Sequence, residues 1–304
     1  MASKLLPITV GFRSGNGHVI GHLYYPQDYN SASRYPAVAV GGPFTTVKEQ
    51  VSGTYAAEMA RRGILALAID YRNYGESSGI TRQYEDPAIK SEDLSAAVRF
   101  LAKRSDVTAT GLLGICTSGG NILYPAAAAH DSSLKAIATV AGFFMDESLQ
   151  PKLFGGEEGI QRRLTAARQA REHFDATGEI KMIKAYHPTD QTAASVSPSD
   201  YYMDETRGGG VRAWRNAFAV MSWDKWIAFD PVSQASAVSV PALIVHSQGA
   251  ALPAQAQKVY DLLKGLKELC WVEEAKTHSD FYDNMAVVAK AADRVARHFH
   301  EVLG

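Results

Sequence analysis

The sequence of 304 residues contains two cysteines, Cys116 and Cys270, too few for a disulfide framework. No CxxC, HExxH or paired-cysteine spacing is present, so we expect neither a metal nor another cofactor. No apolar run reaches the roughly 18 residues that a membrane span needs. The formal charge of -1 at pH 7 gives no general attraction to nucleic acid or to an anionic membrane.

The N-terminal stretch MASKLLPITV has one lysine and a short apolar run, without the apolar core and cleavage site of a signal peptide. Together with the few cysteines, this predicts a cytoplasmic protein. Hydrophobic residues make up 46% of the chain and charged residues 21%, which is ordinary for a soluble globular protein. The length suits one large α/β domain with an insertion, or two domains.

Short apolar runs alternate with amphipathic segments along much of the chain. This alternation predicts an α/β protein with a mostly parallel, doubly wound sheet. Residues 8–26 predict a hairpin, buried strands are predicted at 35–42, 63–70, 111–115, 134–142 and 240–247, and a further strand at 268–275. Helices are predicted at 48–62, 91–103, 122–129, 254–264 and 284–303.

The alternation stops between residues 146 and 230, where the sequence is polar, aromatic and helical in places. We therefore predict a core formed by residues 1–145 and 231–304, with residues 146–230 inserted as a helical cap. Such a cap is expected over the carboxyl ends of the strands, where sheets of this kind bind ligands.

A candidate nucleophile lies in the stretch GLLGICTSGGN, residues 111–121. The pattern Gly114-Ile115-Cys116-Thr117-Ser118 matches the nucleophile elbow G-x-S-x-G, with a thiol at the centre and a serine in place of the last glycine. A reactive side chain at such a strand-to-helix turn faces the helix N-terminus. Ser118 is the alternative nucleophile, and Cys270, on an apolar strand, reads as an inert core residue.

Two further segments complete a candidate active site. The loop GGPFTT, residues 41–46, follows an early strand and can direct the N–H of Phe44 or Thr45 toward the elbow. With the N–H of Thr117, it would form an oxyanion hole. His278 follows the last strand and precedes the last helix, whereas His246 ends a strand and is interpreted as structural.

These segments resemble the α/β-hydrolase superfamily, and more closely its dienelactone-hydrolase-like branch, which includes polyketide transferases and stand-alone polyketide thioesterases. The resemblance covers residues 8–302, and nucleophile first with histidine last is the order it implies. It is carried by GGPFTTVKEQ, IDYRNYGESSG, GICTSGG, FAVMSWDKWIAFDP, LIVHSQGAALP and SDFYD.

The sequence departs from that superfamily at the acid of the catalytic triad. The usual position of the acid, shortly after LIVH, holds Ala250. Either another carboxylate orients His278 or the site is a dyad. Asp146 is the first replacement, Asp230 the second with a helix N-cap as its simpler role, and Asp280 lies uncomfortably close to His278 in sequence.

A thiol explains why the third acid can be missing. A cysteine near a helix N-terminus and a histidine has a lowered pKa and can rest as a thiolate. Its acyl-enzyme is a thioester, so loading from a carrier thioester is nearly isoenergetic and transfer to a hydroxyl is downhill. Aromatic and apolar residues of the cap region would line an enclosed acyl pocket: Phe143, Phe144, Trp214, Met221 and Trp223.

The sequence thus predicts a thioesterase or cyclase that releases a polyketide-like acyl chain as lactone or acid. Cys116 attacks the carbonyl, His278 takes the proton and then activates the second nucleophile, and Asp146 orients His278. The partner is a small-molecule acyl substrate, free or on an acyl carrier protein, and a homodimer is left open. The alternatives are a general carboxylesterase or dienelactone-type lactone hydrolase, and a ligand-binding protein without catalytic activity.

Overall fold

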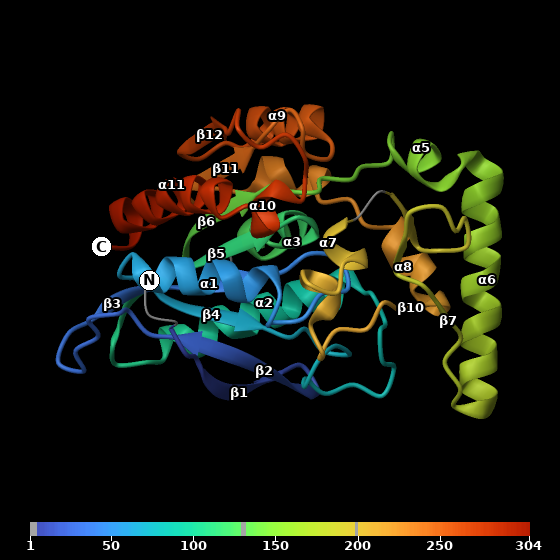
Figure 1. Cartoon of the computed structure of the whole chain (residues 1–304), viewed down its shortest axis with the longest axis horizontal. Coiled ribbons are helices and arrows are strands. Elements are labelled where there is room, and N and C mark those ends of the chain that lie inside the picture. The colour runs from blue at the N-terminus through green and yellow to red at the C-terminus, as the bar shows by residue number, and fades with distance from the viewer. Residues whose placement is uncertain (1–4, 129–131, 198–199) are drawn as a thin grey trace.

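A mixed eight-stranded sheet forms the centre of the computed structural model, which describes residues 5–128, 132–197 and 200–304 (Figure 1). Its strand order is β1-β2-β4-β3-β5-β6-β11-β12. The strands are β1 (Ile8–Ser14), β2 (Gly17–Tyr24), β3 (Tyr35–Gly41), β4 (Leu65–Ile69), β5 (Val107–Ile115), β6 (Leu134–Val140), β11 (Ala242–His246) and β12 (Lys267–Trp271).

The predicted hairpin is confirmed by β1 and β2, which pair antiparallel from Ser14 opposite Gly17 to Ile8 opposite Leu23. β2 also runs antiparallel to β4, and the remaining neighbours are parallel. The central parallel strands β3, β4, β5, β6 and β11 are mostly buried, as their continuous apolar runs predicted, whereas the edge strand β12 is partly exposed. Consequently their carboxyl ends meet at one edge, where the loops carrying the candidate site begin.

Helices cover both faces of the sheet and make a core on each. α1 (Val51–Arg61) and α11 (Met285–Leu303) contact each other and one face. α2 (Pro87–Ala102), α4 (Leu123–Ala127) and α9 (Pro253–Leu262) lie with the 3₁₀ segment η3 (Val232–Ala237) against the other face. α11 packs because its apolar residues recur at helical spacing, which gives it one continuous buried face.

Two helix boundaries differ from the predictions for local reasons. α2 begins at Pro87, before the predicted residue 91, because the Asp86 carboxylate accepts the N–H groups of Ala88 and Ile89. The helix predicted at 122–129 begins earlier, as α3 (Thr117–Asn121), and continues as α4 beyond Ile122. Residue 129, the end of that prediction, lies outside the described residues.

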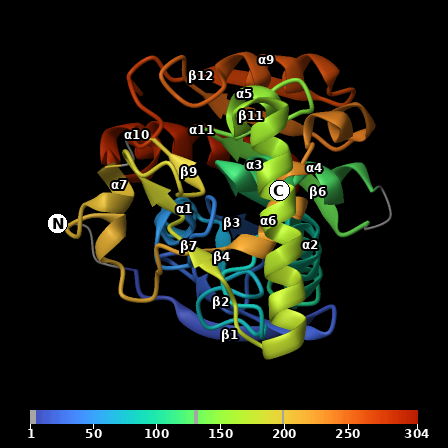
Figure 2. The ribbon, with the colours of Figure 1, turned by 90° about the vertical axis from the view of Figure 1, so that its right-hand side faces the viewer.

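The segment between β6 and β11 contains more than helices. Its elements are α5 (Gln150–Phe154), α6 (Gly156–Thr177), β7 (Met182–Ile183), β8 (Tyr186–His187), β9 (Ser195–Val196), α7 (Asp200–Met203), η1 (Gly208–Gly210), β10 (Phe218–Ala219), η2 (Val220–Ser222) and α8 (Trp223–Ile227). β7 pairs with β10, and β8 with β9. Figure 2 shows α6 lying across the side of the molecule that carries this segment. No helix in the described part of the chain is long and apolar enough to cross a membrane.

Candidate active site

The turn between β5 and α3 holds Cys116 in a strained conformation, with φ 55° and ψ -118°. A non-glycine residue adopts a positive φ only when its surroundings enforce it, and such strain is concentrated at functional sites. Gly114 is required here, because a Cβ on it would lie 2.2 Å from the Ser118 carbonyl oxygen. Gly119 is required too, since its Cβ would lie 2.8 Å from the Gly142 Cα. The geometry is that of a nucleophile elbow.

Ser118 has a structural task that accounts for a serine where the motif has glycine. Its buried hydroxyl donates to the Gly42 carbonyl oxygen and lies 2.6 Å from the Tyr71 hydroxyl oxygen. These bonds connect the elbow to the loop that follows β3. The alternative in which Ser118 is the nucleophile gains no support, because its oxygen is fully buried and already bonded.

The Cys116 sulfur is surrounded by hydrogen-bond donors. The residue is 7% exposed, and burial raises the pKa of its thiol. Hydrogen bonding from the Tyr282 hydroxyl and from the N–H groups of Thr117 and Phe44 acts in the opposite direction on that pKa. Of the two loop donors considered, the structure therefore directs Phe44 toward the sulfur. Thr45, at φ 58°, instead accepts a 3.2 Å bond from Trp214 Nε1 on its carbonyl oxygen.

A buried ion pair holds the Phe44 loop in place. Asp70, at the end of β4, accepts the Lys48 backbone N–H at 2.7 Å and the Lys48 ammonium at 2.9 Å. Both side chains are fully buried. Lys48 closes the loop that carries the Phe44 N–H, so this pair sets the loop relative to the sheet.

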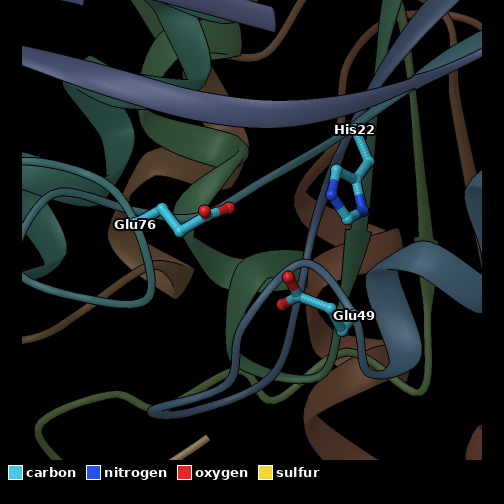
Figure 3. A group of neighbouring side chains, drawn as sticks. All are labelled: His22, Glu49 and Glu76. Atoms are coloured by element: carbon cyan, nitrogen blue, oxygen red, sulfur yellow. The ribbon is translucent and has the colours of Figure 1, made fainter. Parts of the chain in front are cut away.

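Among the described residues, three side chains near Lys48 resemble a metal-binding group: His22, Glu49 and Glu76. Ligand atoms of His22, Glu49 and Glu76 lie within 4.8 Å of one another, and Figure 3 shows them around a common space. However, the Lys48 ammonium lies 2.7 Å from Glu49 and 2.6 Å from Glu76. Burial, followed by the positive charge of Lys48, lowers the pKa of His22. The ammonium already provides a cation for these carboxylates, and we assign no metal to the group.

A second buried ammonium lies on the opposite side of the elbow. Lys90 Nζ is 2.5 Å from Glu85, and both side chains are almost completely buried. The ammonium also lies over the rings of Tyr71 and Tyr74, at 4.8 and 5.0 Å from their centres. Its charge favours the thiolate form of Cys116.

His278 lies between β12 and the short helix α10 (Asp280–Asp283), and its ring nitrogens have unusual partners for a hydrolase. Nδ1 accepts the backbone N–H of Ala251 at 3.1 Å. Nε2 lies 3.0 Å from the Tyr282 hydroxyl oxygen. Burial, aided by His246, lowers the pKa of His278 to about 3, so the ring is neutral at pH 7. Ala250 occupies the usual position of the acid, as the sequence showed.

The prediction that Asp146 orients His278 is not met by the structure. Asp146 accepts the Ser148 hydroxyl at 2.6 Å, the Leu149 N–H at 3.2 Å and the Lys258 ammonium at 2.7 Å. Its carboxylate is engaged in an open cleft of about 660 Å³ that includes Lys258 and leaves out both Cys116 and His278. Asp146 follows β6 at the start of the insertion, and its hydrogen-bond partners among the described residues do not include His278.

The other two acids also serve local structure. Asp230 accepts the Ser233 N–H at 3.1 Å, which is the capping role considered for it. Asp280 accepts the N–H groups of Lys276 and Thr277, and so shapes the loop that carries His278. His246 is fully buried, with its two ring nitrogens near backbone carbonyl oxygens, which agrees with a structural residue.

An aromatic group from the insertion covers the elbow, and the sequence indicated only part of it. Tyr186 donates to the Phe44 carbonyl oxygen at 2.9 Å and stacks on Tyr202 with ring centres 3.9 Å apart. Tyr202 in turn packs against Trp214 and Tyr282. Sequence reasoning missed Tyr282 as a site residue, although it lies four positions after His278, a spacing that places both on one side of a helical turn.

The residues predicted to bind the acyl chain divide into two groups. Phe143, Trp214 and Trp223 pack in the same cluster as Cys116, and the Phe143 N–H donates to the Cys116 carbonyl oxygen at 2.8 Å. Phe144 points into the core on the opposite face of the sheet, and Met221 belongs to a separate cluster with Tyr84. The structure therefore does not bring Phe144 or Met221 to the nucleophile.

Comparison with known proteins agrees with this architecture, although no protein-family model matches the chain. The uncharacterized protein PA2218 of Pseudomonas aeruginosa is 32% identical over 298 residues, which cover 92% of this chain and 76% of that protein. The crystal structure of PA2218 superimposes with a TM-score of 0.83 over 99% of this chain and 94% of that one.

Two named fungal relatives are more distant. Thiohydrolase aneE of Aspergillus aculeatus is 26% identical and covers 82% of this chain and 81% of the relative. Acyltransferase drtE of Aspergillus calidoustus is also 26% identical, with 82% of both chains covered.

Two further solved structures share the fold. The α/β hydrolase GrgF from Penicillium sp. sh18 has a TM-score of 0.77 at 21% identity, covering 97% of this chain and all of that one. A dienelactone hydrolase from Anabaena variabilis has a TM-score of 0.58 at 13% identity, covering 99% of this chain and all of that one. The chain belongs to the α/β-hydrolase superfamily and is related to its thiohydrolases and acyltransferases.

Proposed function

We propose that this protein is a cysteine-dependent acyl-transfer enzyme that takes its acyl group from a thioester. The observation that carries the proposal is the position of the Cys116 sulfur, on a strained elbow and facing the N–H groups of Thr117 and Phe44. These donors suit the oxyanion that forms when a carbonyl is attacked there. The names of the thiohydrolase and acyltransferase relatives support the same class of reaction.

In the first half-reaction, the Cys116 thiol gives up its proton to solvent, its sulfur attacks the thioester carbonyl and a carbon–sulfur bond forms. The carbonyl electron pair moves to the oxygen, which accepts the N–H groups of Thr117 and Phe44. When this intermediate collapses, the bond to the leaving sulfur breaks. The leaving group departs as a thiolate and takes its proton from solvent, leaving the acyl group on Cys116 as a thioester.

In the second half-reaction, a hydroxyl group or water attacks the carbonyl of the acyl-enzyme, and His278 Nε2 accepts its proton. The carbon–sulfur bond to Cys116 then breaks, and the proton on His278 returns to the Cys116 thiolate. To accept a proton at Nε2, the ring must carry its other proton on Nδ1. In the structure, Nδ1 accepts the Ala251 N–H, which places the ring proton of the neutral histidine on Nε2. The Ala251 contact must therefore open before the histidine can act as a base.

The acyl group we propose is polyketide-like, carried on a small thiol or on an acyl carrier protein, and is released as lactone or acid. Phe143, Trp214 and Trp223 belong to the same apolar cluster as the nucleophile. Because the elbow is almost completely buried, an internal hydroxyl of the bound chain competes well with water.

Two alternatives make different predictions. A general carboxylesterase or dienelactone-type lactone hydrolase would act on oxygen esters, and its serine-type chemistry would be helped by an acid at residue 250, where this chain has alanine. A ligand-binding homologue without activity would agree with that alanine, but the strained Cys116 and the donors around it serve no purpose in such a protein.

Intact-protein mass spectrometry tests the proposal. Wild type, Cys116→Ala, His278→Ala and the control Cys270→Ala are each incubated with hydroxyacyl thioesters and with the matching oxygen esters. We expect an acyl adduct on wild type and Cys270→Ala that is lost in Cys116→Ala. The adduct should persist longer in His278→Ala, because the second half-reaction loses its base.

The products separate the candidate activities. Lactone identifies a cyclase and free acid identifies a thioesterase. Turnover of the oxygen esters at rates equal to the thioesters would favour the carboxylesterase. No adduct and no turnover, combined with retention of the ligand, would contradict the proposal and favour the binding protein.

A further inference from the structure

We propose that Tyr282 is a catalytic residue of this site, whose hydroxyl links His278 to the Cys116 sulfur and donates to that sulfur as its thiolate forms. The inference rests on the proposed function, in which Cys116 is the nucleophile, and adds a residue that the elbow motif does not include. In the usual arrangement the histidine contacts the nucleophile directly. Here the tyrosine lies between them.

The position of Tyr282 follows from three contacts. Its hydroxyl oxygen is 3.0 Å from His278 Nε2, with the two rings nearly perpendicular at 78°. The same hydroxyl interacts with the Cys116 sulfur. The preceding residue, Phe281, is held by a 2.9 Å bond from the Tyr55 hydroxyl to its carbonyl oxygen, which anchors α10 to α1.

The direction of the hydrogen bonds that run from Ala251 through His278 to Tyr282 is determined by the Ala251 N–H. A backbone N–H can only donate, so the 3.1 Å contact from Ala251 makes His278 Nδ1 an acceptor. The neutral ring consequently has its proton on Nε2 and donates to the Tyr282 oxygen. The phenol proton is then free to point at the sulfur. A chain that donates at every step stabilises a negative charge at its end.

Other ionisable groups also face Cys116 and His278. Tyr186 and Tyr202, from β8 and α7, face Cys116, and burial raises the pKa of both phenols well above the usual range. His246, from β11, faces His278, and burial lowers its pKa. Lys90, from α2, adds a positive charge that favours the thiolate. The Tyr202 hydroxyl also interacts with that of Tyr282. Among these described groups, Tyr282 is the one that interacts with both His278 and the sulfur.

Titration of the thiol tests this role without any acyl substrate. In a Cys270→Ser background, Cys116 is the single cysteine, and its alkylation by iodoacetamide is followed against pH by mass spectrometry. The midpoint of that profile reports the thiol pKa, whereas access to the buried sulfur changes only the plateau rate. We expect Tyr282→Phe to move the midpoint upward by about one to two pKa units, the equivalent of one hydrogen bond to a charged group.

Tyr55→Phe is the matched control, because it removes a buried hydroxyl that anchors α10 but does not reach the sulfur. Its midpoint should stay at the wild-type value. An unchanged midpoint in folded Tyr282→Phe, or an equal displacement in Tyr55→Phe, would overturn the proposal. If Tyr282→Phe does not fold, His278→Leu asks the same question, since loss of the Nε2 donor must still raise the midpoint.

The result is independent of the acyl-transfer assay. A displaced midpoint with no acyl adduct on wild type would support the chain while contradicting the proposed function. An acyl adduct on wild type with an unchanged midpoint in Tyr282→Phe would support the proposed function and contradict the role of Tyr282.

Discussion

The two sides of the candidate site are held by different kinds of interaction. On the cysteine side, two buried ion pairs, Lys48 with Asp70 and Lys90 with Glu85, flank the elbow and the loop that carries Phe44. On the histidine side, the ring of His278 meets a backbone N–H and a phenol, and the described contacts include no carboxylate.

This difference indicates which species the site stabilises. A serine hydrolase needs an acid to hold the imidazolium that forms when the histidine takes the serine proton. A thiol can lose its proton before substrate arrives, so the charge that matters is negative and lies on sulfur. The Lys90 ammonium and the N–H donors beside Cys116 favour that thiolate, but burial outweighs them, so the pKa of the resting thiol is raised and not lowered as the sequence predicted.

The largest expected effect comes from breaking the ion pair on the cysteine side. Glu85→Gln removes the one carboxylate beside the buried Lys90 ammonium, and removing one partner of such a pair costs about 3–5 kcal/mol of unfolding free energy. Urea unfolding measures it. Glu92→Gln is the control on α2, the helix that carries Lys90. Glu92 is half exposed and its partner Arg72 keeps its bond to Asp93, so the substitution should cost less than about 1 kcal/mol. Equal losses of unfolding free energy in the two variants would mean that the buried Lys90 pair stabilises the protein no more than the Glu92 pair does.

The second prediction places an acid on the histidine side. Ala250→Asp puts a carboxylate near His278 and should raise the low pKa of that ring by about 1–3 units, because an opposite charge favours the imidazolium. An NMR titration of the histidine rings measures this, with His278→Gln to identify the signal. Ala250→Asn has nearly the same shape without the charge and should leave the pKa low. If the His278 ring titrates as in wild type, the side chain at residue 250 does not interact with it.

The third prediction concerns the contact that joins the elbow to the oxyanion loop. Ser118→Ala leaves the Tyr71 hydroxyl and the Gly42 carbonyl without this partner, and a buried unsatisfied group costs about 1–3 kcal/mol. Acyl-adduct formation should slow as well, because the loop carrying Phe44 loses its tie. Ser95→Ala, on the outer part of α2, serves as the control. Full stability and full adduct rate in Ser118→Ala would contradict this structural role.

The smallest effect at neutral pH is expected from Asp146, which the structure separates from both sides of the site. Burial raises its pKa, but bonds from Lys258, Ser148 and Gln255 outweigh this and lower the pKa to about 2. A carboxylate with a lowered folded-state pKa stabilises the protein above the unfolded value of about 4, and that stability disappears as the pH falls toward 2.

Wild type should therefore lose about 2 kcal/mol more than Asp146→Asn between pH 4 and pH 2, as measured by urea unfolding at each pH. Lys258→Met should flatten the same slope, because it removes the positive charge that lowers the pKa. At pH 7 the adduct rate of Asp146→Asn should equal that of wild type. A rate loss as large as that of His278→Ala would restore Asp146 to the catalytic site.

Much of the fold was predictable because its elements leave periodic signals. The buried parallel strands are continuous apolar runs, and the hairpin alternates around a turn at Gly15 and Asn16. The start of α2 was misplaced because the cap at Asp86 and Pro87 lies outside the apolar periodicity. The short strand pairs of the insertion were missed because two residues are too few to show a period.

The candidate site was predictable only in part. Cys116 was indicated by local sequence, since the glycines that permit its strained turn are adjacent to it in the chain. Phe44 and His278 were indicated by their order relative to the strands. The prediction that Asp146 orients His278 failed because a carboxylate that follows a neighbouring strand can bind different partners. Here it binds the ammonium of Lys258, 112 residues later.

What the sequence by itself determined is the elbow, the order of the strands and the absence of an acid at residue 250, because these depend on neighbours along the chain. What only the tertiary structure decided is the partner of each site residue. Tyr282 meets both Cys116 and His278, and Ala251 meets His278 Nδ1, because β11, α10 and the elbow converge at one edge of the sheet. The Cys116–Tyr282 contact joins residues more than a hundred positions apart and the Ala251–His278 contact joins residues 27 apart, and a local sequence pattern predicts neither.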